Sequence, residues 1–293
     1  MKGSFEFARL ICVLLLIFTH TRHNYSEGLA YFILEEVPKV GTLILSLISG
    51  YLYYSVSRKN KNIFEKKVKS LLIPYLIANI SVLSLVVIAN FIFEINFLNR
   101  LDFNFDLIFE GIIALNSPPI NPPTFFIRDI FIIFVLIEIF RNKKYFLLIL
   151  ILPLAIYGEL ILRYEILYLF VIGLLTAKYS EKLGKSSIIL TIVISSLPLF
   201  YFDIVEIKHL VSILFFIGIL TVNLNFKNVG GFTYLLHLYH SPIIVFVYPI
   251  ISYYFSNQVV LVICQIILSI IFIYALYLLT RKVTFLKVIS GQR

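Results

Sequence analysis

Long apolar segments alternate with short polar ones along almost the whole chain. An apolar run of about 17 to 25 residues can cross the hydrocarbon core of a bilayer as a helix. The runs are continuous and do not alternate with a period of two, so they favour transmembrane helices over the strands of a β-barrel. The predicted helices are at about residues 5–21, 37–56, 71–93, 124–140, 145–158, 162–178, 186–202, 207–222, 233–255 and 258–280.

The composition agrees with a membrane protein of ten helices. Hydrophobic residues make up 60% of the 293 residues and charged residues only 14%. A soluble domain of this length would need more charge to cover its surface. No second domain, internal repeat or low-complexity tail stands out. We therefore predict one integral membrane domain over residues 1–293, with an all-α, polytopic helix-bundle fold.

The distribution of Lys and Arg predicts how the helices are oriented. Most of the 25 Lys and Arg residues fall in loops on the side of the N-terminus. The opposite side keeps Arg22, Lys39, Arg100, Arg163 and Lys208. Because basic loops stay in the cytoplasm, both termini are predicted to be cytoplasmic, which requires an even number of helices. Topology thus accounts for the net charge of +9, and no nucleic acid partner is expected.

The first predicted helix carries two ionisable residues, Arg9 and His20, in an otherwise apolar run. Eleven residues of α-helix make about three turns and rise about 16 Å, so both side chains are expected on one face. Ionisable residues inside a membrane are costly and usually face a polar interior. His20 could then act as a general base, and Arg9 could stabilise negative charge. Alternatively, Arg9 reaches the cytoplasmic headgroups and His20 marks the outer interface.

Five short motifs along the chain resemble those of the acyltransferase-3 family, the multi-pass bacterial O-acyltransferases of surface glycans. They are Arg9 with His20, Ser49–Leu52 (SGYL), Lys66–Tyr75 (KKVKSLLIPY), Phe125–Asp129 (FFIRD) and Tyr234–His237 (YLLH). The resemblance extends from the first predicted helix to the ninth. Two features depart from the family pattern. The chain has no tryptophan, and Lys66 and Lys69 replace an Arg pair, which keeps the charge but loses bidentate phosphate recognition.

The resemblance implies a membrane O-acetyltransferase of the bacterial cytoplasmic (inner) membrane. Such an enzyme moves an acetyl group from cytoplasmic acetyl-CoA to a hydroxyl of a cell-surface or lipid-linked sugar, of the O-antigen, capsule or exopolysaccharide type. His20 and Arg9 would be catalytic, and Lys66 and Lys69 would contact the donor. The implied partners are acetyl-CoA, the glycan acceptor and membrane lipid. No bound cofactor is expected, and a homo-oligomer is compatible with the reading.

Several other residues are candidates for lining a cavity or binding substrate. They are Ser49, Gly50, Arg128, Tyr234 and His237. Close packing of helices is the alternative for Ser49 and Gly50. Topology and the binding of anionic lipid are the alternative for the basic run that contains Lys66 and Lys69.

For the polar residues of two later helices, a structural role is the alternative to a functional one. Arg128 could be half of an interfacial pair with Asp129, although adjacent residues on a helix do not face each other. His237 and His240 lie one turn apart, but no third ligand is evident, so no metal site is predicted. Hydrogen bonding between helices is expected for at least one of these histidines.

Two other classes of function remain open from the sequence. A multi-pass transporter or flippase of a lipid-linked sugar would also have about ten helices and buried charge. Its expected signature is a pair of repeats or broken helices in the two halves, and no clear pair is visible. A purely structural membrane subunit would not require Arg9 and His20 on one face.

Overall fold

The computed structural model describes residues 3–59, 62–94, 98, 101–139, 160–180 and 207–291. Regular structure in these residues is helical throughout, with no strand. The predicted all-α class is therefore confirmed for the described part of the chain. The predicted helices 145–158 and 186–202 lie outside it.

Each of the other predicted helices has a counterpart in the structure. The long helices are α1 (Gly3–Phe18), α3 (Val40–Ser55), α5 (Ile73–Phe93), α7 (Phe125–Ile139), α9 (Tyr164–Ser180), α11 (Ile207–Thr221), α12 (Gly230–Tyr254) and α13 (Gln258–Lys282). Shorter helices are α2 (Gly28–Tyr31), α4 (Ile63–Lys67) and α6 (Asp106–Ile108). The agreement follows from the long apolar runs, whose backbone groups pair within a helix.

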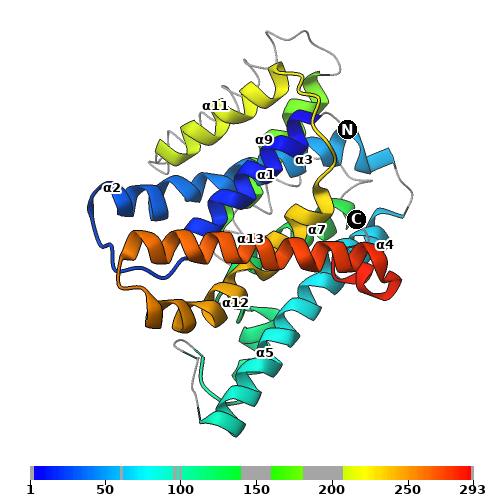
Figure 1. Cartoon of the computed structure of the whole chain (residues 1–293). Helices are drawn as coiled ribbons and strands as arrows, with labels where there is room; N and C mark the ends of the chain where they lie inside the picture. Colours follow the sequence, from blue (N-terminus) through cyan, green and yellow to red (C-terminus); the bar gives the residue numbers. More distant parts are fainter. Residues whose placement is uncertain are drawn as a thin grey trace. The chain divides into compact units, whose positions relative to one another are not determined.

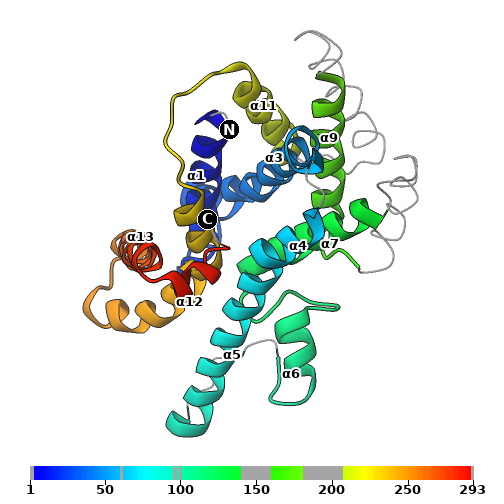
Figure 2. The same cartoon turned by 90° about the vertical axis from the view of Figure 1, so that its right-hand side faces the viewer.

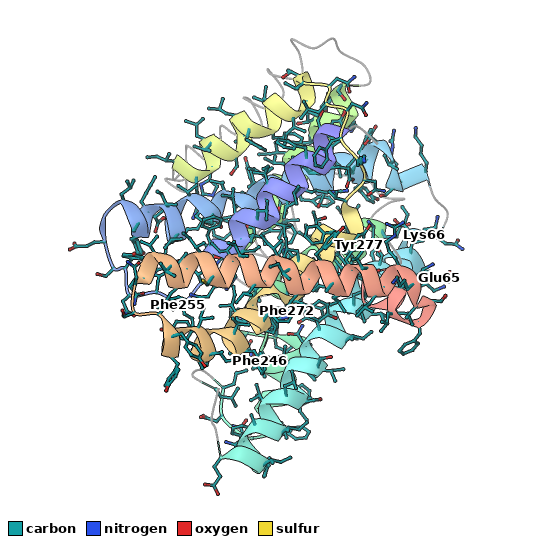
Figure 3. The ribbon with its side chains drawn as sticks, viewed as in Figure 1. Glu65, Lys66, Phe246, Phe255, Phe272 and Tyr277 are labelled. Carbon is teal, nitrogen blue, oxygen red and sulfur yellow. The ribbon has the colours of Figure 1, made fainter. Side chains whose placement is uncertain are left out.

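Three helical stretches of the described chain are long and apolar enough to cross a membrane: Ile63–Ile92, Gly230–Tyr254 and Gln258–Lys282. The apolar helix α11 is shorter. Large apolar side chains of α12 and α13 project away from the ribbon, with Phe246 73% and Phe272 51% exposed (Figure 3). Exposed apolar surface of this kind suits contact with lipid. These features indicate a membrane protein, while ten helices and two cytoplasmic termini stay predictions.

The chain divides into two compact units, which are described separately. The first unit comprises the described residues of Met1–Thr19, Tyr25–Ile63 and Arg163–Gly230. Its most extensive contact is between α3 and α9, and both α1 and α11 also pack on α3 (Figure 2).

Two glycines allow α3 and α9 to approach closely. A Cβ on Gly50 of α3 would overlap the carbonyl of Phe170, and a Cβ on Gly173 of α9 would overlap the carbonyl of Leu47. Without these side chains the two backbones meet directly, as small residues permit in membrane helix pairs.

The second unit comprises the described residues of His20–Asn24, Phe64–Leu162 and Gly231–Arg293. Its helices α12 and α13 are joined by residues 255–257 and lie next to each other near this turn (Figure 1). Val247, Ile251 and Leu261 are buried between them. Asn257 starts α13, because its side-chain oxygen accepts hydrogen bonds from the backbone N–H groups of Val259 and Val260.

Candidate active site

His20 follows the first helix and does not lie within it. α1 ends at Phe18, where Thr19 donates a side-chain hydrogen bond to the carbonyl of Leu16 at 3.0 Å. The expected continuous helix over 5–21 was therefore wrong at its C-terminal end. The argument from helical periodicity does not apply to His20.

The segment after α1 is held by α13 of the second unit. The backbone N–H of Arg22 donates to Gln265 Oε1 at 2.7 Å, and Gln265 Nε2 donates to the carbonyl of Arg22 at 3.0 Å. A side chain that satisfies both backbone groups of one residue replaces the hydrogen bonds a helix would provide. This pairing is the physical reason why the chain leaves the helical path at His20.

His20 packs against His240 of α12, with ring centroids 5.1 Å apart and an interplanar angle of 55°. His20 is half-buried and His240 is fully buried. His240 Nδ1 lies 2.6 Å from the carbonyl oxygen of Leu236. A carbonyl oxygen only accepts, so Nδ1 carries the proton and Nε2 of the neutral ring is an acceptor. Among the described residues, buried Nε2 has no hydrogen-bond partner.

A second buried polar cluster in this unit links α5 to the proline-rich loop, Ser117–Pro123 (SPPINPP), which precedes α7. Asn79 Nδ2 donates to Thr124 Oγ1 at 3.0 Å, and Asn79 Oδ1 accepts from the backbone N–H of Asn121 at 3.2 Å. All three residues are buried. The cluster fixes the loop before α7.

Asn121 also compensates for a proline inside α12. Pro242 has no N–H to donate to the carbonyl of Leu238, four residues earlier in the helix. The side-chain Nδ2 of Asn121 donates to that carbonyl at 2.7 Å. Asn121 Oδ1 is buried and has no hydrogen-bond partner within the described residues. Sequence reasoning missed Asn79, Asn121 and this role; the proline within an apolar run is the signal that could have indicated it.

The two residues predicted from the YLLH motif are buried and hydrogen-bonded to backbone carbonyls. His237 Nε2 lies 3.0 Å from the carbonyl oxygen of Pro123, and the ring also contacts Phe126. Tyr234 donates its hydroxyl to the carbonyl of Leu71 at 3.4 Å. These bonds tie α12 to neighbouring segments, as expected for hydrogen bonding between helices. Their role as cavity or substrate-binding residues stays a prediction.

Arg128 and Asp129 at the start of α7 form a buried ion pair, with Arg128 Nη1 2.8 Å from Asp129 Oδ1. Arg128 also donates to the carbonyls of Ile113 at 3.2 Å and Leu160 at 3.1 Å. The argument that adjacent residues would not pair was wrong, because the long side chain of Arg128 reaches the carboxylate of the next residue. The bonds of Arg128 go to atoms of this unit and hold two segments against α7.

Arg9 lies in the first unit, paired with a carboxylate one turn before it. Arg9 Nη1 is 2.8 Å from Glu6 Oε1, and Glu6 is buried whereas Arg9 is only partly so. Glu6 Oε2 also accepts from the backbone N–H of Val229 at 3.3 Å. Glu6 therefore fixes the direction of the guanidinium. The sequence contained this signal, since residues three apart on a helix are neighbours.

Lys66 and Lys69 are exposed at α4 and the π-helical turn η4 (Val68–Leu72) that follows it. Lys69 pairs with Glu65 at 2.6 Å, and both side chains are at least half exposed. Lys66 and Glu65 project outward from the same short helix (Figure 3). Both lysines are accessible to a charged ligand.

Ser49 and Gly50 lie where α3 meets α9. The close approach at Gly50 matches the packing alternative, and a role in binding substrate stays a prediction for both residues. No group of three or more His, Cys, Asp or Glu that could hold a metal ion occurs among the described residues.

A family model described as an acyltransferase domain matches residues 2–278. The chain belongs to the acyltransferase-3 family. The family resemblance drawn from the five motifs is thereby confirmed, and membership implies an acyltransferase that works in a membrane. No curated protein and no solved structure matches the chain.

The acyltransferase motifs are distributed over both units. Arg9 and the Ser49–Leu52 motif belong to the first unit, whereas His20 and the three later motifs belong to the second. Within the second unit, His20 packs against His240, a residue that lies outside the five motifs.

Proposed function

We propose that this acyltransferase is a membrane O-acetyltransferase. It would transfer an acetyl group from cytoplasmic acetyl-CoA to a hydroxyl of a cell-surface or lipid-linked sugar. Family membership supports acyl transfer in a membrane. The observation that carries the catalytic assignment is His20 itself, a half-buried imidazole beside a buried histidine in an apolar helical protein. Such a residue is a functional candidate by default.

In the proposed reaction, His20 acts as the general base. It takes the proton from the acceptor hydroxyl while the hydroxyl oxygen attacks the thioester carbonyl carbon. A carbon–oxygen bond forms, the carbon–sulfur bond breaks, and the thiolate of coenzyme A receives the proton from His20. The products are the acetyl ester and a free thiol. Proton transfer by a positioned base contributes about 10² to 10⁴ in rate.

Arg9 supplies positive charge in this proposal. Its guanidinium would stabilise the negative charge of the donor phosphates or of the oxygen in the transition state. The bond to Glu6 at 2.8 Å supports such a role, since it orients the guanidinium in advance. Preorganised charge stabilises a transition state without reorganisation during the reaction.

Lys66 and Lys69 are proposed to bind the phosphates of acetyl-CoA on the cytoplasmic side. The exposed pair of Lys69 with Glu65 does not oppose this, because exposed ion pairs contribute only about 0 to 1 kcal/mol. A phosphate group could displace Glu65 at little cost. The proposed location is the bacterial cytoplasmic membrane, with both termini in the cytoplasm.

The mass of the glycan product tests the proposal. Purified protein in lipid nanodiscs would receive acetyl-CoA and an extract of lipid-linked glycans from the cells that encode it. We expect release of free thiol and a gain of one acetyl unit on a glycan. Movement of the glycan across a vesicle membrane with no change in mass would contradict the proposal and favour a transporter.

The donor contacts are tested in the same assay. The double variant Lys66→Gln/Lys69→Gln should raise the KM for acetyl-CoA about tenfold, since each lost phosphate contact weakens ground-state and transition-state binding alike. Lys59→Gln, in the first unit, is the matched control for loss of a surface charge. An unchanged KM in the double variant would remove Lys66 and Lys69 from the donor site.

A further inference from the structure

His240 keeps one ring nitrogen available next to the proposed base. Its Nδ1 is bound to the carbonyl of Leu236, and its buried Nε2 has no partner among the described residues. Leaving a buried acceptor without a hydrogen bond is unfavourable, because the acceptor has lost its water without gaining another donor. A fully buried histidine in this condition indicates that a donor reaches Nε2 in the working protein.

The ring of His20 packs against the ring of His240. A hydrogen bond between two nitrogens spans about 3 Å and each nitrogen lies about 1 Å from its ring centre, so bonded imidazoles have centroids about 5 Å apart. The observed separation is 5.1 Å. The two rings are therefore close enough for a hydrogen bond between a ring N–H of His20 and Nε2 of His240.

We propose that His240 is a positioning residue for His20. Its Nε2 accepts a hydrogen bond from one ring nitrogen of His20, which holds the proton on that nitrogen and leaves the lone pair of the other nitrogen unprotonated. This inference rests on the proposed function, in which that lone pair takes the proton of the acceptor hydroxyl. When His20 becomes an imidazolium, Nε2 keeps the same hydrogen bond and stabilises the charge. No proton passes to His240.

The structure explains why this hydrogen bond has one direction, with His20 as the donor and His240 as the acceptor. The carbonyl of Leu236 fixes the Nδ1–H tautomer of His240, so Nε2 can only accept. In many enzymes a second group forms a hydrogen bond with the catalytic imidazole and so holds it in one tautomer. Here a neutral imidazole takes the place of a carboxylate, which spares the buried site a negative charge.

Three substitutions separate the functions of the two nitrogens of His240. His240→Gln extends an amide oxygen to about the position of Nε2 and keeps an acceptor for His20. His240→Asn is shorter, so its amide can donate to the carbonyl of Leu236 but does not reach His20. His240→Leu removes both interactions. Tyr239→Phe, on the adjacent position of α12, is the control for a change in this segment.

The first test is the ¹⁵N chemical shift of histidine side chains in nanodiscs, which reports the tautomer without any substrate. The chain has only 5 histidines, so the signals of His20 are assigned by their loss in His20→Gln. We expect a single tautomer of His20 in wild type and in His240→Gln. We expect a mixture of tautomers in His240→Asn and His240→Leu. Unchanged His20 signals in these last two variants would overturn the proposal.

The second test is the acetyl-transfer assay with acetyl-CoA and the lipid-linked glycan extract. His240→Leu and His240→Asn should lower kcat about tenfold to a hundredfold and leave both KM values within about twofold, less than the loss of the base itself. His240→Gln should restore most of kcat. Equal loss of kcat in all three variants, with Tyr239→Phe unaffected, would overturn the positioning role. Absence of transfer by the wild type would overturn the proposed function alone, since the ¹⁵N signals are read without substrate.

Discussion

Arg128 and His240 are both buried polar residues of the second unit, yet they use their polar atoms differently. Arg128 donates to Asp129, Ile113 and Leu160, so its bonds join three segments of the same unit. His240 donates from Nδ1 to the carbonyl of Leu236, and its Nε2 has no partner in the described structure.

This difference supports the proposed positioning role of His240, whereas the described bonds of Arg128 all go to neighbouring segments. Buried polar groups are almost always hydrogen-bonded, so an exception requires an explanation. The sequence predicted a cavity role for Arg128 and a structural role for at least one of His237 and His240. The cavity role of Arg128 stays a prediction, and the hydrogen bonds show only that its guanidinium also joins segments of the second unit.

The largest effect on stability is expected from Arg128→Leu. The substitution leaves the carboxylate of Asp129 buried without its charged partner, which costs about 3 to 5 kcal/mol. Denaturant unfolding in detergent micelles measures the loss. The double variant Arg128→Leu/Asp129→Leu should recover part of it, because the buried charge is then removed. A loss below about 1 kcal/mol in the single variant would show that the pair does not hold the fold.

Asn121→Ala should have an intermediate effect, about 1 to 3 kcal/mol, because the carbonyl of Leu238 loses its donor. The proline in α12 provides a matched control. In a Pro242→Ala background the helix can supply a backbone N–H to Leu238, so Asn121→Ala should cost less there. The free energy of unfolding would be measured in detergent micelles. An equal loss from Asn121→Ala in the two backgrounds would contradict the compensation between Asn121 and Pro242.

His240→Leu should lower stability by only about 1 to 2 kcal/mol. It removes the bond to Leu236 and the proposed bond to His20, and one hydrogen bond contributes a net of about 1 kcal/mol. The same variant is expected to lower kcat about tenfold to a hundredfold, so stability and activity separate. A loss of stability as large as that of Arg128→Leu would make His240 a fold-holding residue and remove the contrast.

The smallest effect is expected at Glu110, in the π-helical turn η5 (Phe109–Ile113) before the proline-rich loop. Burial alone would raise the pKa of Glu110, but hydrogen bonds from Asn116 and Ser117 to its carboxylate outweigh burial and hold the pKa below the ordinary value. Because folding lowers the pKa of Glu110, its carboxylate stabilises the loop above about pH 4.3, the ordinary pKa of Glu. This stabilisation is lost as the pH falls through the pKa of Glu110 in the folded protein.

Hydrogen exchange of the Asn116 and Ser117 amides tests this at two pH values. Glu110→Gln should reduce protection at pH 7 and have a smaller effect at pH 3, where a larger fraction of the wild-type carboxyl is protonated. Equal reduction at both values would mean that the charge of Glu110 does not order the loop.

The helices could be predicted from the sequence because each apolar run determines its own backbone hydrogen bonds locally. The end of α1 could not, since it depends on Gln265, far along the chain. For the same reason the sequence identified His20 as a candidate but not its neighbour His240. Glu6 was within reach of sequence reasoning, because it lies one helical turn from Arg9.

The buried pairing of Asn79 with Thr124 was beyond sequence reasoning. Both residues are small polar side chains in or beside apolar runs. Their local bonds go to the backbone carbonyls of Tyr75 and Asn121, and a backbone carbonyl leaves no mark in the pattern of residue types. Their bond depends on which face α5 turns to the proline-rich loop, and only tertiary packing decides that.

The central claim is that His20 is the base of an acetyl transfer, and the rate of thiol release by His20→Ala tests it most directly. Wild type and variant would be compared in nanodiscs with acetyl-CoA and the lipid-linked glycan extract, at equal amounts of folded protein. The account predicts a fall of about 10² to 10⁴ in kcat. Turnover equal to that of the wild type would contradict it.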